Sequence, residues 1–281
     1  MNNLLQQTKE FLINNPADIA KDQFFLIDPN VIAKLIASAH ITSQDRILEV
    51  GPGLGFITAE LAKQAGEVVA IEIDERFKPF LNTLPSKVEI LYGNAYQMIN
   101  NRSFREKTKP FTKMVSSIPY SQAQNMLHNY TNYPWYQGDL VWLAPKSLAE
   151  KINHEPILGA FFRADIVMDV PKTAFFPQPN TSSAIIYFKR IEDPIRSRNF
   201  TLYIRRYFYN HEHLKVKNAI REGIISAVWD LKHTRVTKNQ ARELIAALAI
   251  SDEELEQLTN NIKPEYYFSI PEVLTNWFNS I

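Results

Sequence analysis

The sequence predicts an α/β protein whose mostly parallel sheet is followed by a small, all-helical domain. Over the first 190 residues, short β-rich runs alternate with helical patterns, which is the order typical of a parallel sheet with helices on both faces. After Pro194 only helical periodicity remains, for example at Ile220, Ile224 and Val228. A chain of 281 residues is long enough for one large and one small domain.

The composition is that of an ordinary globular protein. Hydrophobic residues make up 45% and charged residues 22% of the chain, which excludes a disordered one. There are no cysteines, so thiol nucleophiles, iron–sulfur clusters and cysteine-bound zinc are excluded. The chain has no apolar run of membrane-spanning length and no secretory signal at its start. We therefore expect a cytoplasmic protein, monomeric and without a membrane partner.

The net charge of +1 hides an uneven distribution along the chain. Residues 186–240 contain 12 Lys and Arg but only 5 Asp and Glu, whereas residues 241–281 contain 2 and 7. A solvated helical face explains the basic stretch as well as an anionic partner such as RNA does, and the charge alone does not separate them.

The secondary structure is predicted in chain order. Residues 1–19 form an N-terminal helical extension, and Asp28 caps a helix that begins at Pro29 and runs to about Ala39. The predicted strands are 46–50, 67–73, 88–92, 113–116, 139–144, 165–170 and 184–190, and helices cover 56–64, 75–84 and 122–130. Residues 20–191 form the α/β domain, 191–198 a charged linker and 199–281 the helical domain. We expect all four tryptophans, Trp229 among them, to pack in the cores.

A glycine-rich loop is the first candidate site. Three of the eight glycines, Gly51, Gly53 and Gly55, lie within five residues between a predicted strand and helix. Glycine permits a positive φ and a close approach of the backbone to a ligand, and the helix start offers free N–H groups. Glu72, at the end of the next strand, can accept both hydroxyls of a ribose.

Two cofactors remain open at this point. A dinucleotide site has the spacing G-x-G-x-x-G, and here the third glycine comes one position early. The loop also carries no basic residue for a pyrophosphate. Both points favour S-adenosylmethionine over NAD, but modestly, because the ribose-binding acid serves either.

Further candidate cofactor-binding and catalytic residues follow the third and fourth predicted strands. Asn94 follows the third strand, where a polar side chain can read the adenine ring of a nucleoside cofactor. The fourth strand runs into Ser117, Ile118, Pro119 and Tyr120, a stiff loop with an aromatic ring that can stack on a base. Acceptors on this loop can hold an exocyclic amino group so that its lone pair faces a methyl donor. The combination is typical of amino methylation of nucleobases.

These segments resemble the KsgA/Erm family of ribosomal RNA adenine dimethyltransferases. The resemblance rests on 23–28 (QFFLID), 47–58 (ILEVGPGLGFIT), 69–74 (VAIEID), 174–184 (AFFPQPNTSSA) and 199–220. It implies a class I S-adenosylmethionine-dependent methyltransferase, Rossmann-like with a seven-stranded sheet, whose partner is ribosomal RNA or a ribosomal subunit particle. The histidines of the chain, such as His211 and His213, lack the spacing of metal ligands, so we expect no metal.

The resemblance and the spacings assign roles to particular residues. The catalytic set is Ser117, Ile118, Pro119, Tyr120 and Phe175, with Phe175 forming the base-pocket wall opposite Tyr120. The cofactor-binding set is Gln23, Leu26, Gly51, Gly53, Glu72, Ile73, Asn94, Ala95 and Ser116. The helical domain contributes RNA contacts from Arg205, Arg206, Lys215, Lys217 and Arg221.

The chain departs from the family pattern at four places. Ser117 replaces the Asn of the catalytic motif, Asn94 replaces an Asp, and Asp22 replaces the Gly before Gln23. The basic run of the helical domain is 210–213 (NHEH) here. Three hypotheses follow: adenine N6 dimethylation with Ser117 as acceptor, cytosine N4 methylation, or an inactive RNA-binding or ribosome assembly factor.

Overall fold

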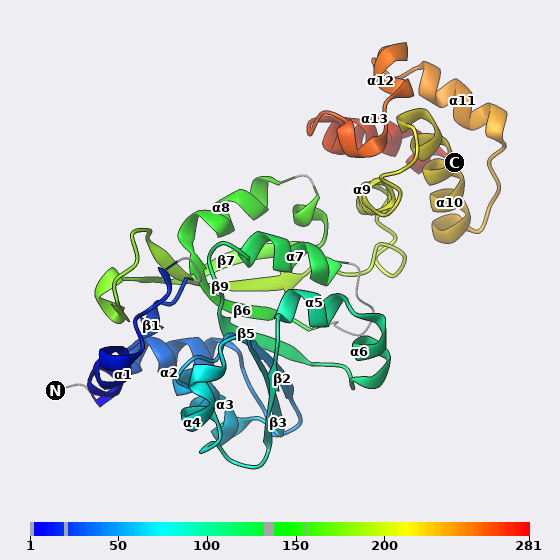
Figure 1. Cartoon of the computed structure of the whole chain (residues 1–281). Helices are drawn as coiled ribbons and strands as arrows, with labels where there is room; N and C mark the ends of the chain where they lie inside the picture. Colours follow the sequence, from blue (N-terminus) through cyan, green and yellow to red (C-terminus); the bar gives the residue numbers. More distant parts are fainter. Residues whose placement is uncertain (1–2, 20–21, 132–137, 156) are drawn as a thin grey trace. The chain divides into compact units, whose positions relative to one another are not determined.

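The computed structural model describes residues 3–19, 22–131, 138–155 and 157–281. The chain forms two compact units (Figure 1): 1–153 with 163–190, and 154–162 with 191–281. The sequence patterns place 154–162 in the first domain, and this prediction was wrong. Ile157 instead packs on the helical core, and Ala160 accepts a hydrogen bond from Arg206 Nε at 3.0 Å. Local sequence patterns do not reveal such distant partners.

Unit 1 is built on a seven-stranded sheet of order β4-β3-β2-β5-β6-β9-β7 flanked by helices, as predicted. The neighbouring strands from β4 to β6 are parallel, and β9 is antiparallel to β6. From β2 the chain proceeds outward through β3 and β4, then returns to β5 on the other side. This reversal opens a crevice at the carboxyl ends of the strands, where ligands bind in such sheets. The strands are β2 Arg46–Val50, β3 Glu67–Glu72, β4 Val88–Tyr92, β5 Lys113–Ser117, β6 Leu140–Pro145, β7 Phe162–Val170 and β9 Ser183–Arg190.

A two-stranded sheet outside the main one was not predicted. It pairs β1 (Phe25–Leu26) with β8 (Phe175–Phe176) and so brings the N-terminal segment to the loop before β9. Two-residue strands have no periodicity, and only the partner strand defines them.

The helices of unit 1 follow the capping signals only in part. Asp28 Oδ1 accepts from Asn30 N at 2.9 Å, and Pro29 opens α2, as predicted. The single helix predicted over 75–84 was wrong: a 3₁₀ turn, Glu75–Phe77, precedes a short α4, because Pro79 lacks the N–H that a continuous helix needs. The helices are α1 Asn3–Asn14, α2 Pro29–Ser38, α3 Phe56–Gln64, α4 Lys78–Leu81, α5 Ala95–Asn100, α6 Arg102–Lys107, α7 Ala123–Thr131 and α8 Lys146–His154.

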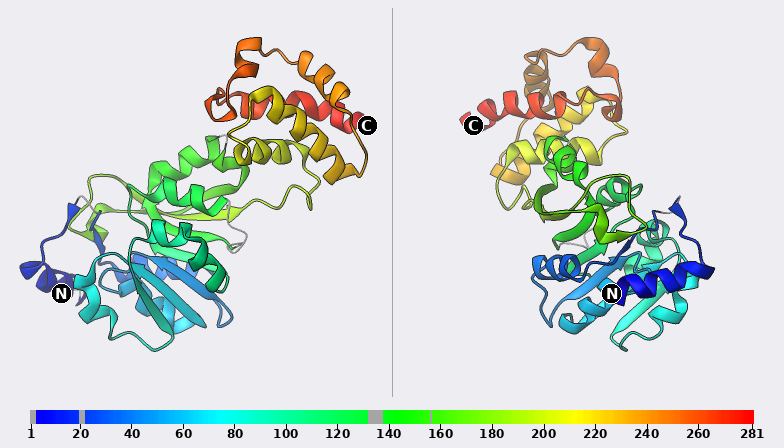
Figure 2. Two further views of the ribbon diagram at one scale, coloured as in Figure 1. Left: turned by 45° about the vertical axis from the view of Figure 1, so that its right-hand side comes forward. Right: turned by 90° about the vertical axis from the view of Figure 1, so that its left-hand side faces the viewer.

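Clusters of buried apolar side chains hold the helices of unit 1 against its sheet. Apolar residues of α2 and α3, such as Leu35 and Leu61, pack on strand residues Ile47, Val68 and Val115. The N-terminal helix α1 has a separate contact through Phe11, whose ring lies against the rings of Phe77 and Phe80. Figure 2 shows α1, in dark blue, on the outside of unit 1. No helix within the described ranges is long and apolar enough to cross a membrane.

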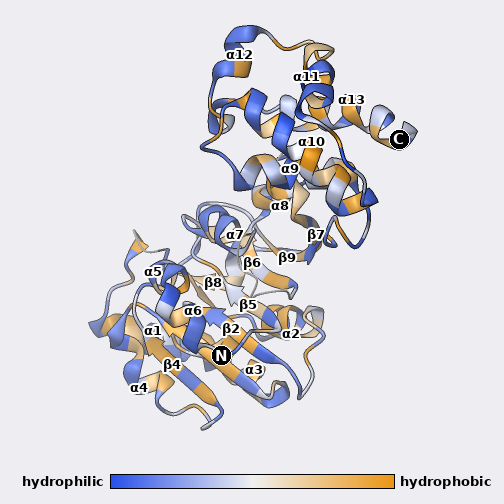
Figure 3. Ribbon diagram, turned by 90° about the vertical axis from the view of Figure 1, so that its right-hand side faces the viewer, coloured by the Kyte–Doolittle hydropathy of each residue, from blue (hydrophilic) through white to orange (hydrophobic). Residues whose placement is uncertain are grey.

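Unit 2 is a helical assembly around its own apolar core. Figure 3 shows the polar faces of α11 and α12, and residues such as Ile204, Ile220 and Phe278 are buried inside the unit. The helices are α9 Phe200–Asn210, α10 Val216–Lys232, α11 Lys238–Ala246, α12 Asp252–Glu256 and α13 Tyr266–Ser280, with 3₁₀ turns at Leu158–Ala160 and Thr259–Asn261.

The tryptophans do not all lie where we expected. Trp142 is fully buried, as predicted, and Trp277 is partly buried against the helical core. Trp229 is 50% exposed, so the prediction that it packs in a core was wrong. The helix period explains the difference, because Val228 faces the core and its neighbour Trp229 is turned about 100° away. Trp135 lies outside the described residues.

Candidate functional site

A cavity of about 490 Å³ lies at the carboxyl ends of the central strands. Its volume is in the range of cofactor and ligand sites. It is lined by the segment around Gln23, the glycine loop, the ends of β3 and β4, and the loop after β5. The predicted site residues on its lining are Gln23, Leu26, Gly51, Gly53, Glu72, Ile73, Asn94, Ala95, Ser117, Ile118, Pro119, Tyr120 and Phe175.

The glycine loop has the backbone that only glycine adopts readily. Gly51 has a φ of +69° and Gly53 a φ of +55°, both in the left-handed region. A Cβ on Gly53 would come within 3.5 Å of the Phe25 ring. The two glycines therefore keep one wall of the cavity free of side chains.

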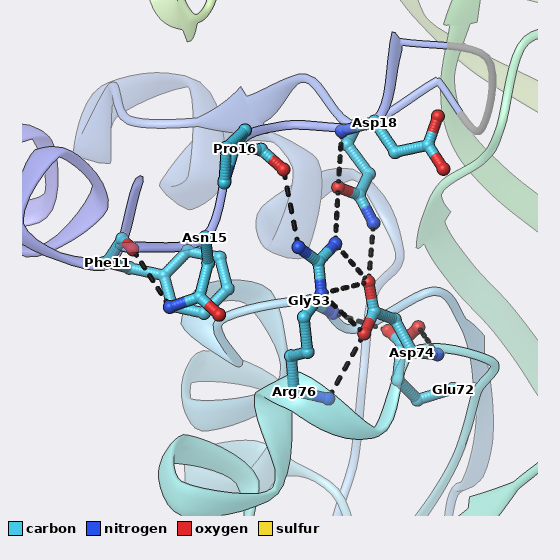
Figure 4. A network of polar contacts seen from close by, with 9 residues as sticks. Phe11, Asn15, Pro16, Asp18, Gly53, Glu72, Asp74 and Arg76 are labelled. Carbon is cyan, nitrogen blue, oxygen red and sulfur yellow. Dashed lines mark hydrogen bonds and ion pairs between the residues drawn. The ribbon is translucent and has the colours of Figure 1, made fainter. Parts of the chain in front are cut away.

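Glu72 connects this loop to the end of β3. Its Oε2 accepts from Gly53 N at 2.9 Å and its Oε1 from Asp74 N at 2.8 Å (Figure 4). Burial raises the pKa of the Glu72 carboxyl, and the bonds from the two backbone N–H groups oppose that rise. Glu72 is 3% exposed and lies on the cavity lining, where its carboxyl can accept hydrogen bonds from a ligand.

Gln23 is held by a polar network that includes Asp18, Asp74 and Arg76, and Figure 4 labels these three residues. Its Nε2 donates to Asp74 Oδ2 at 2.8 Å, and its Oε1 accepts from Asp18 N at 2.8 Å. Hydrogen bonds from the Arg76 guanidinium lower the pKa of Asp74 to about 2. Gln23 thus ties the N-terminal segment to the end of β3. Asp74 and Arg76 were missed as site-supporting residues, since the sequence separation hides their link to Gln23.

Asn94 has a structural task besides its predicted one. Its Oδ1 accepts from Gln97 N at 3.1 Å and caps α5. An Asp would cap the helix in the same way and leave a second acceptor, whereas Asn presents a donor, the Nδ2 group. The change from the family's Asp therefore preserves the cap and alters what the cavity offers an adenine edge.

The loop after β5 is fixed by contacts at both ends. Ile118 N donates to Leu143 O of β6 at 3.0 Å, which places Ser117 at the end of the strand. The Tyr120 hydroxyl is hydrogen-bonded to the Ser183 hydroxyl. Burial raises the pKa of Tyr120, so this phenol stays neutral at physiological pH. Ser183 lies in the segment 174–184, and only the structure shows it as the partner of Tyr120.

Two predicted residues have surroundings that the sequence did not indicate. Phe175 lines the cavity but is only 1% exposed, because it is paired with Leu26 across the small sheet. The ring in contact with Tyr120 is that of Phe24, with centroids 6.2 Å apart. Ser116 is outside the cavity lining and fully buried, and its hydroxyl accepts from Val50 N at 2.8 Å. It links β5 to β2 rather than facing the cavity.

Asp22 explains one departure from the family pattern. It has a φ of +56°, a conformation that Gly adopts freely and Asp tolerates better than most residues. Its carboxylate accepts from Ser121 N at 2.8 Å and so anchors the loop that carries Tyr120.

We expect Asp22→Val to lower the free energy of unfolding by about 1–2 kcal/mol, because a β-branched residue is strained at this φ. Asp22→Gly, which has no such strain, should lose less stability. Urea denaturation of both variants checks this. Equal losses in the two variants would mean that the lost carboxylate contact, and not the backbone conformation, dominates.

The five predicted RNA contacts of the helical domain already have partners inside unit 2. The Arg205 guanidinium lies over the Phe268 ring at 4.6 Å and is 8% exposed, and Arg206 donates to the carbonyls of Ala160 and Ile191. Lys215 and Lys217 both pair with Glu256, and Arg221 pairs with Glu222. These five side chains lie in the predicted domain, but each has a contact that RNA would have to displace or share.

The fold is that of the Rossmann-like methyltransferase class. Two solved structures share the fold: a dimethyladenosine transferase from Plasmodium falciparum (19% identity, TM-score 0.57, covering 90% of this chain and 96% of that one) and the 23S rRNA methyltransferase ErmE (19%, 0.54, covering 89% and 99%).

This chain belongs to the ribosomal RNA adenine dimethylase family, whose model matches residues 17–253. It is similar to the ribosomal RNA small subunit methyltransferase A of Listeria monocytogenes serotype 4a, with 33% identity over 198 residues, 63% of this chain and 65% of that protein. The enzyme of the same name from Enterococcus faecalis is 32% identical over 207 residues, 67% of this chain and 70% of that one. The chain thus matches about two thirds of the length of these relatives.

Proposed function

We propose that this protein transfers methyl groups from S-adenosylmethionine to an exocyclic amino group of ribosomal RNA, namely N6 of adenine, which it dimethylates. The observation that carries the proposal is the cavity that joins the glycine loop, Glu72, Asn94 and the loop from Ser117 to Tyr120. Membership of the adenine dimethylase family supports the choice of base.

The cavity fits a nucleoside cofactor. The left-handed glycines leave room at one wall, and Glu72 presents a buried carboxyl beside it. The Ile73 side chain is 56% exposed and lies on the lining, available to contact an adenine face. Bound S-adenosylmethionine would supply an electrophilic methyl group. Glu72 would hold its ribose, and the Asn94 amide would donate to the adenine edge.

The loop after β5 would position the target base. The base must be unpaired or flipped, because its amino group is unreachable within a stack. Tyr120 would stack on it, held in place by Ser183. The Ser117 hydroxyl and the Ile118 carbonyl would accept the amino hydrogens and orient the nitrogen lone pair. The amine can lose its proton after transfer, so catalysis rests on proximity and orientation.

Product analysis tests the proposal. The protein is incubated with labelled S-adenosylmethionine and with unmodified small- and large-subunit particles or naked ribosomal RNA, and the labelled nucleosides are identified by mass spectrometry. Dimethyladenosine is the expected product. Unlabelled RNA, with cofactor binding confirmed, would mean that the fold has lost the reaction and serves as a binding or assembly factor.

Ser117 specifically favours a second candidate, methylation of cytosine N4. A serine at this position resembles the Ser-Pro-Pro-Tyr loops of amino methyltransferases that act on cytosine. Labelled N4-methylcytidine in the same experiment would establish it and exclude the adenine assignment.

We expect Glu72→Gln to raise the dissociation constant for S-adenosylhomocysteine about tenfold. The amide can keep one acceptor on Gly53 N but offers the ribose hydroxyls fewer acceptors and no charge. Calorimetric titration measures the change, with Glu75→Gln as a control, since Glu75 is the exposed partner of Lys78. An unchanged dissociation constant would place the ribose elsewhere.

The proposed substrate also leads to expectations about the partner, the cellular location and the oligomeric state of the protein. Ribosomal RNA or a subunit particle is the partner, the protein acts in the cytoplasm, and it acts as a monomer. Sedimentation of the purified protein with and without small-subunit particles tests the partner and the oligomeric state together.

A further inference from the structure

An exposed tryptophan on unit 2 lies in a hollow that the proposed chemistry does not use. Trp229, near the end of α10, is 50% exposed and lines a surface hollow with Ile225, Thr234, Arg235 and Val236. The Arg235 guanidinium lies 5.7 Å from the centre of the Trp229 ring. An exposed indole beside an arginine is suited to stack on a nucleobase, since every base has a π face.

A basic hollow adjoins the first. Thr234 lines both, and the second hollow also has Arg198, Lys232 and His233 on its lining. No acidic side chain is among the described residues that line either hollow. The nearest acid along α10, Asp230, accepts a hydrogen bond from the Tyr203 hydroxyl at 2.5 Å. An aromatic face beside a group of positive charges is the combination that single-stranded nucleic acid binding requires.

We infer that the Trp229 platform, defined as Trp229, Arg235 and the adjoining Arg198, Lys232 and His233, is a binding site for a single-stranded segment of RNA. One unpaired base stacks on Trp229, and the neighbouring phosphates bind Arg198, Lys232 and Arg235. This deepens the proposed function, on which it rests, by assigning an RNA contact outside the methyl-transfer cavity. It differs from the earlier set of Arg205, Arg206, Lys215, Lys217 and Arg221 by its exposed ring. Lys232, like the members of that set, already has a contact, since its Nζ donates to Phe278 O at 2.5 Å.

The test is binding of a fluorescein-labelled, unstructured single-stranded RNA of mixed sequence to the full chain. Trp229→Ala should raise the dissociation constant about tenfold, the lower range for loss of one base–aromatic stack. Trp229→Phe keeps a ring and should stay within about threefold. Arg235→Gln should reduce the slope of log affinity against log salt by about 0.7, the contribution of one phosphate contact to a single strand.

The matched control is Phe268→Ala. Phe268 is also an exposed aromatic of unit 2, at 41%, and it also has an arginine over its ring. RNA binding should survive this change. Melting temperature and S-adenosylhomocysteine binding should be the same in all variants, which separates a lost contact from a damaged fold.

Three outcomes of the binding measurements would overturn the inference. A Trp229→Ala variant could bind the RNA as wild type does, or a Phe268→Ala variant could lose as much affinity. The third is weakened binding to small-subunit particles with naked RNA unaffected, which would make the hollow a docking site for a ribosomal protein.

Methyl transfer from labelled cofactor, measured on the same samples, distinguishes a failure of this inference from a failure of the proposed function. Trp229-dependent RNA binding without any methyl transfer would contradict the proposed function and support the Trp229 platform. Methyl transfer with a KM for particles that Trp229→Ala does not change would contradict the platform alone.

Discussion

The free energy of unfolding of the wild-type protein should fall by about 3–5 kcal/mol relative to that of Glu49→Gln as the pH rises from about 5 to about 9. Glu49 lies on β2 directly before the glycine loop and is 1% exposed. Its Oε2 has no hydrogen-bond partner in the described part of the chain. Burial raises the pKa of Glu49 to about 8, and the neighbouring Glu72 acts in the same direction.

The sign follows from the two states of the chain. An unfolded Glu ionises near pH 4.5, whereas the folded protein retains the proton up to about pH 8. Below about pH 4.5 both states are protonated and the contribution of Glu49 to stability is complete. As the pH rises toward 8, only the unfolded state loses its proton, and this contribution is progressively lost.

Urea denaturation at several pH values measures this dependence. Glu89→Gln is the control, because Glu89 is an exposed carboxylate on β4 of the same sheet and its curve should run parallel to that of wild type. Parallel curves for wild type and Glu49→Gln would show that Glu49 is ionised in the folded protein and that another group compensates its charge.

Tyr120→Ala should lower the rate of methyl transfer to ribosomal particles at least about 100-fold while leaving S-adenosylhomocysteine binding within about threefold. The ring is the stacking surface proposed for the target base, and loss of orientation at the reacting atoms costs about 100-fold. Single-turnover transfer from labelled cofactor measures the effect.

The ring and the hydroxyl of Tyr120 can be separated. Tyr120→Phe keeps the ring and loses only the bond to Ser183, so we expect a loss of about fivefold. Ser183→Ala removes the same bond from the other side, and the double variant should be no worse than either single one. A Tyr120→Ala enzyme as active as the Tyr120→Phe enzyme would contradict the stacking role.

The departures from the family pattern are of two kinds. Those at Asp22 and Asn94 concern the local backbone, whereas the one at Ser117 concerns the proposed reaction. Asp22 adopts a left-handed conformation that glycine also favours, and Asn94 caps α5. Both residues line the cavity. Ser117 is different, because a hydroxyl on a shorter side chain replaces an amide at the proposed reacting centre. Product analysis is therefore most informative about this residue.

The sequence by itself determined the alternation of strands and helices, the glycine loop and the acid that faces it. These features are local: hydrophobic period, capping residues and glycine placement act over a few residues, and parallel strands bring their carboxyl ends to one edge. The same reasoning assigned Ser116 to the cavity and Trp229 to a core, because local patterns define the strand and the helix but not the direction of each side chain.

Only the tertiary structure decided the rest. It paired Tyr120 with Ser183, 63 residues away, and Gln23 with Asp74, 51 residues away. It joined 154–162 to the helical unit and supplied partners for Arg205, Arg206, Lys215, Lys217 and Arg221 while leaving Trp229 exposed. Such contacts join residues that are far apart in the sequence. Local sequence patterns act over a few residues and therefore do not predict them.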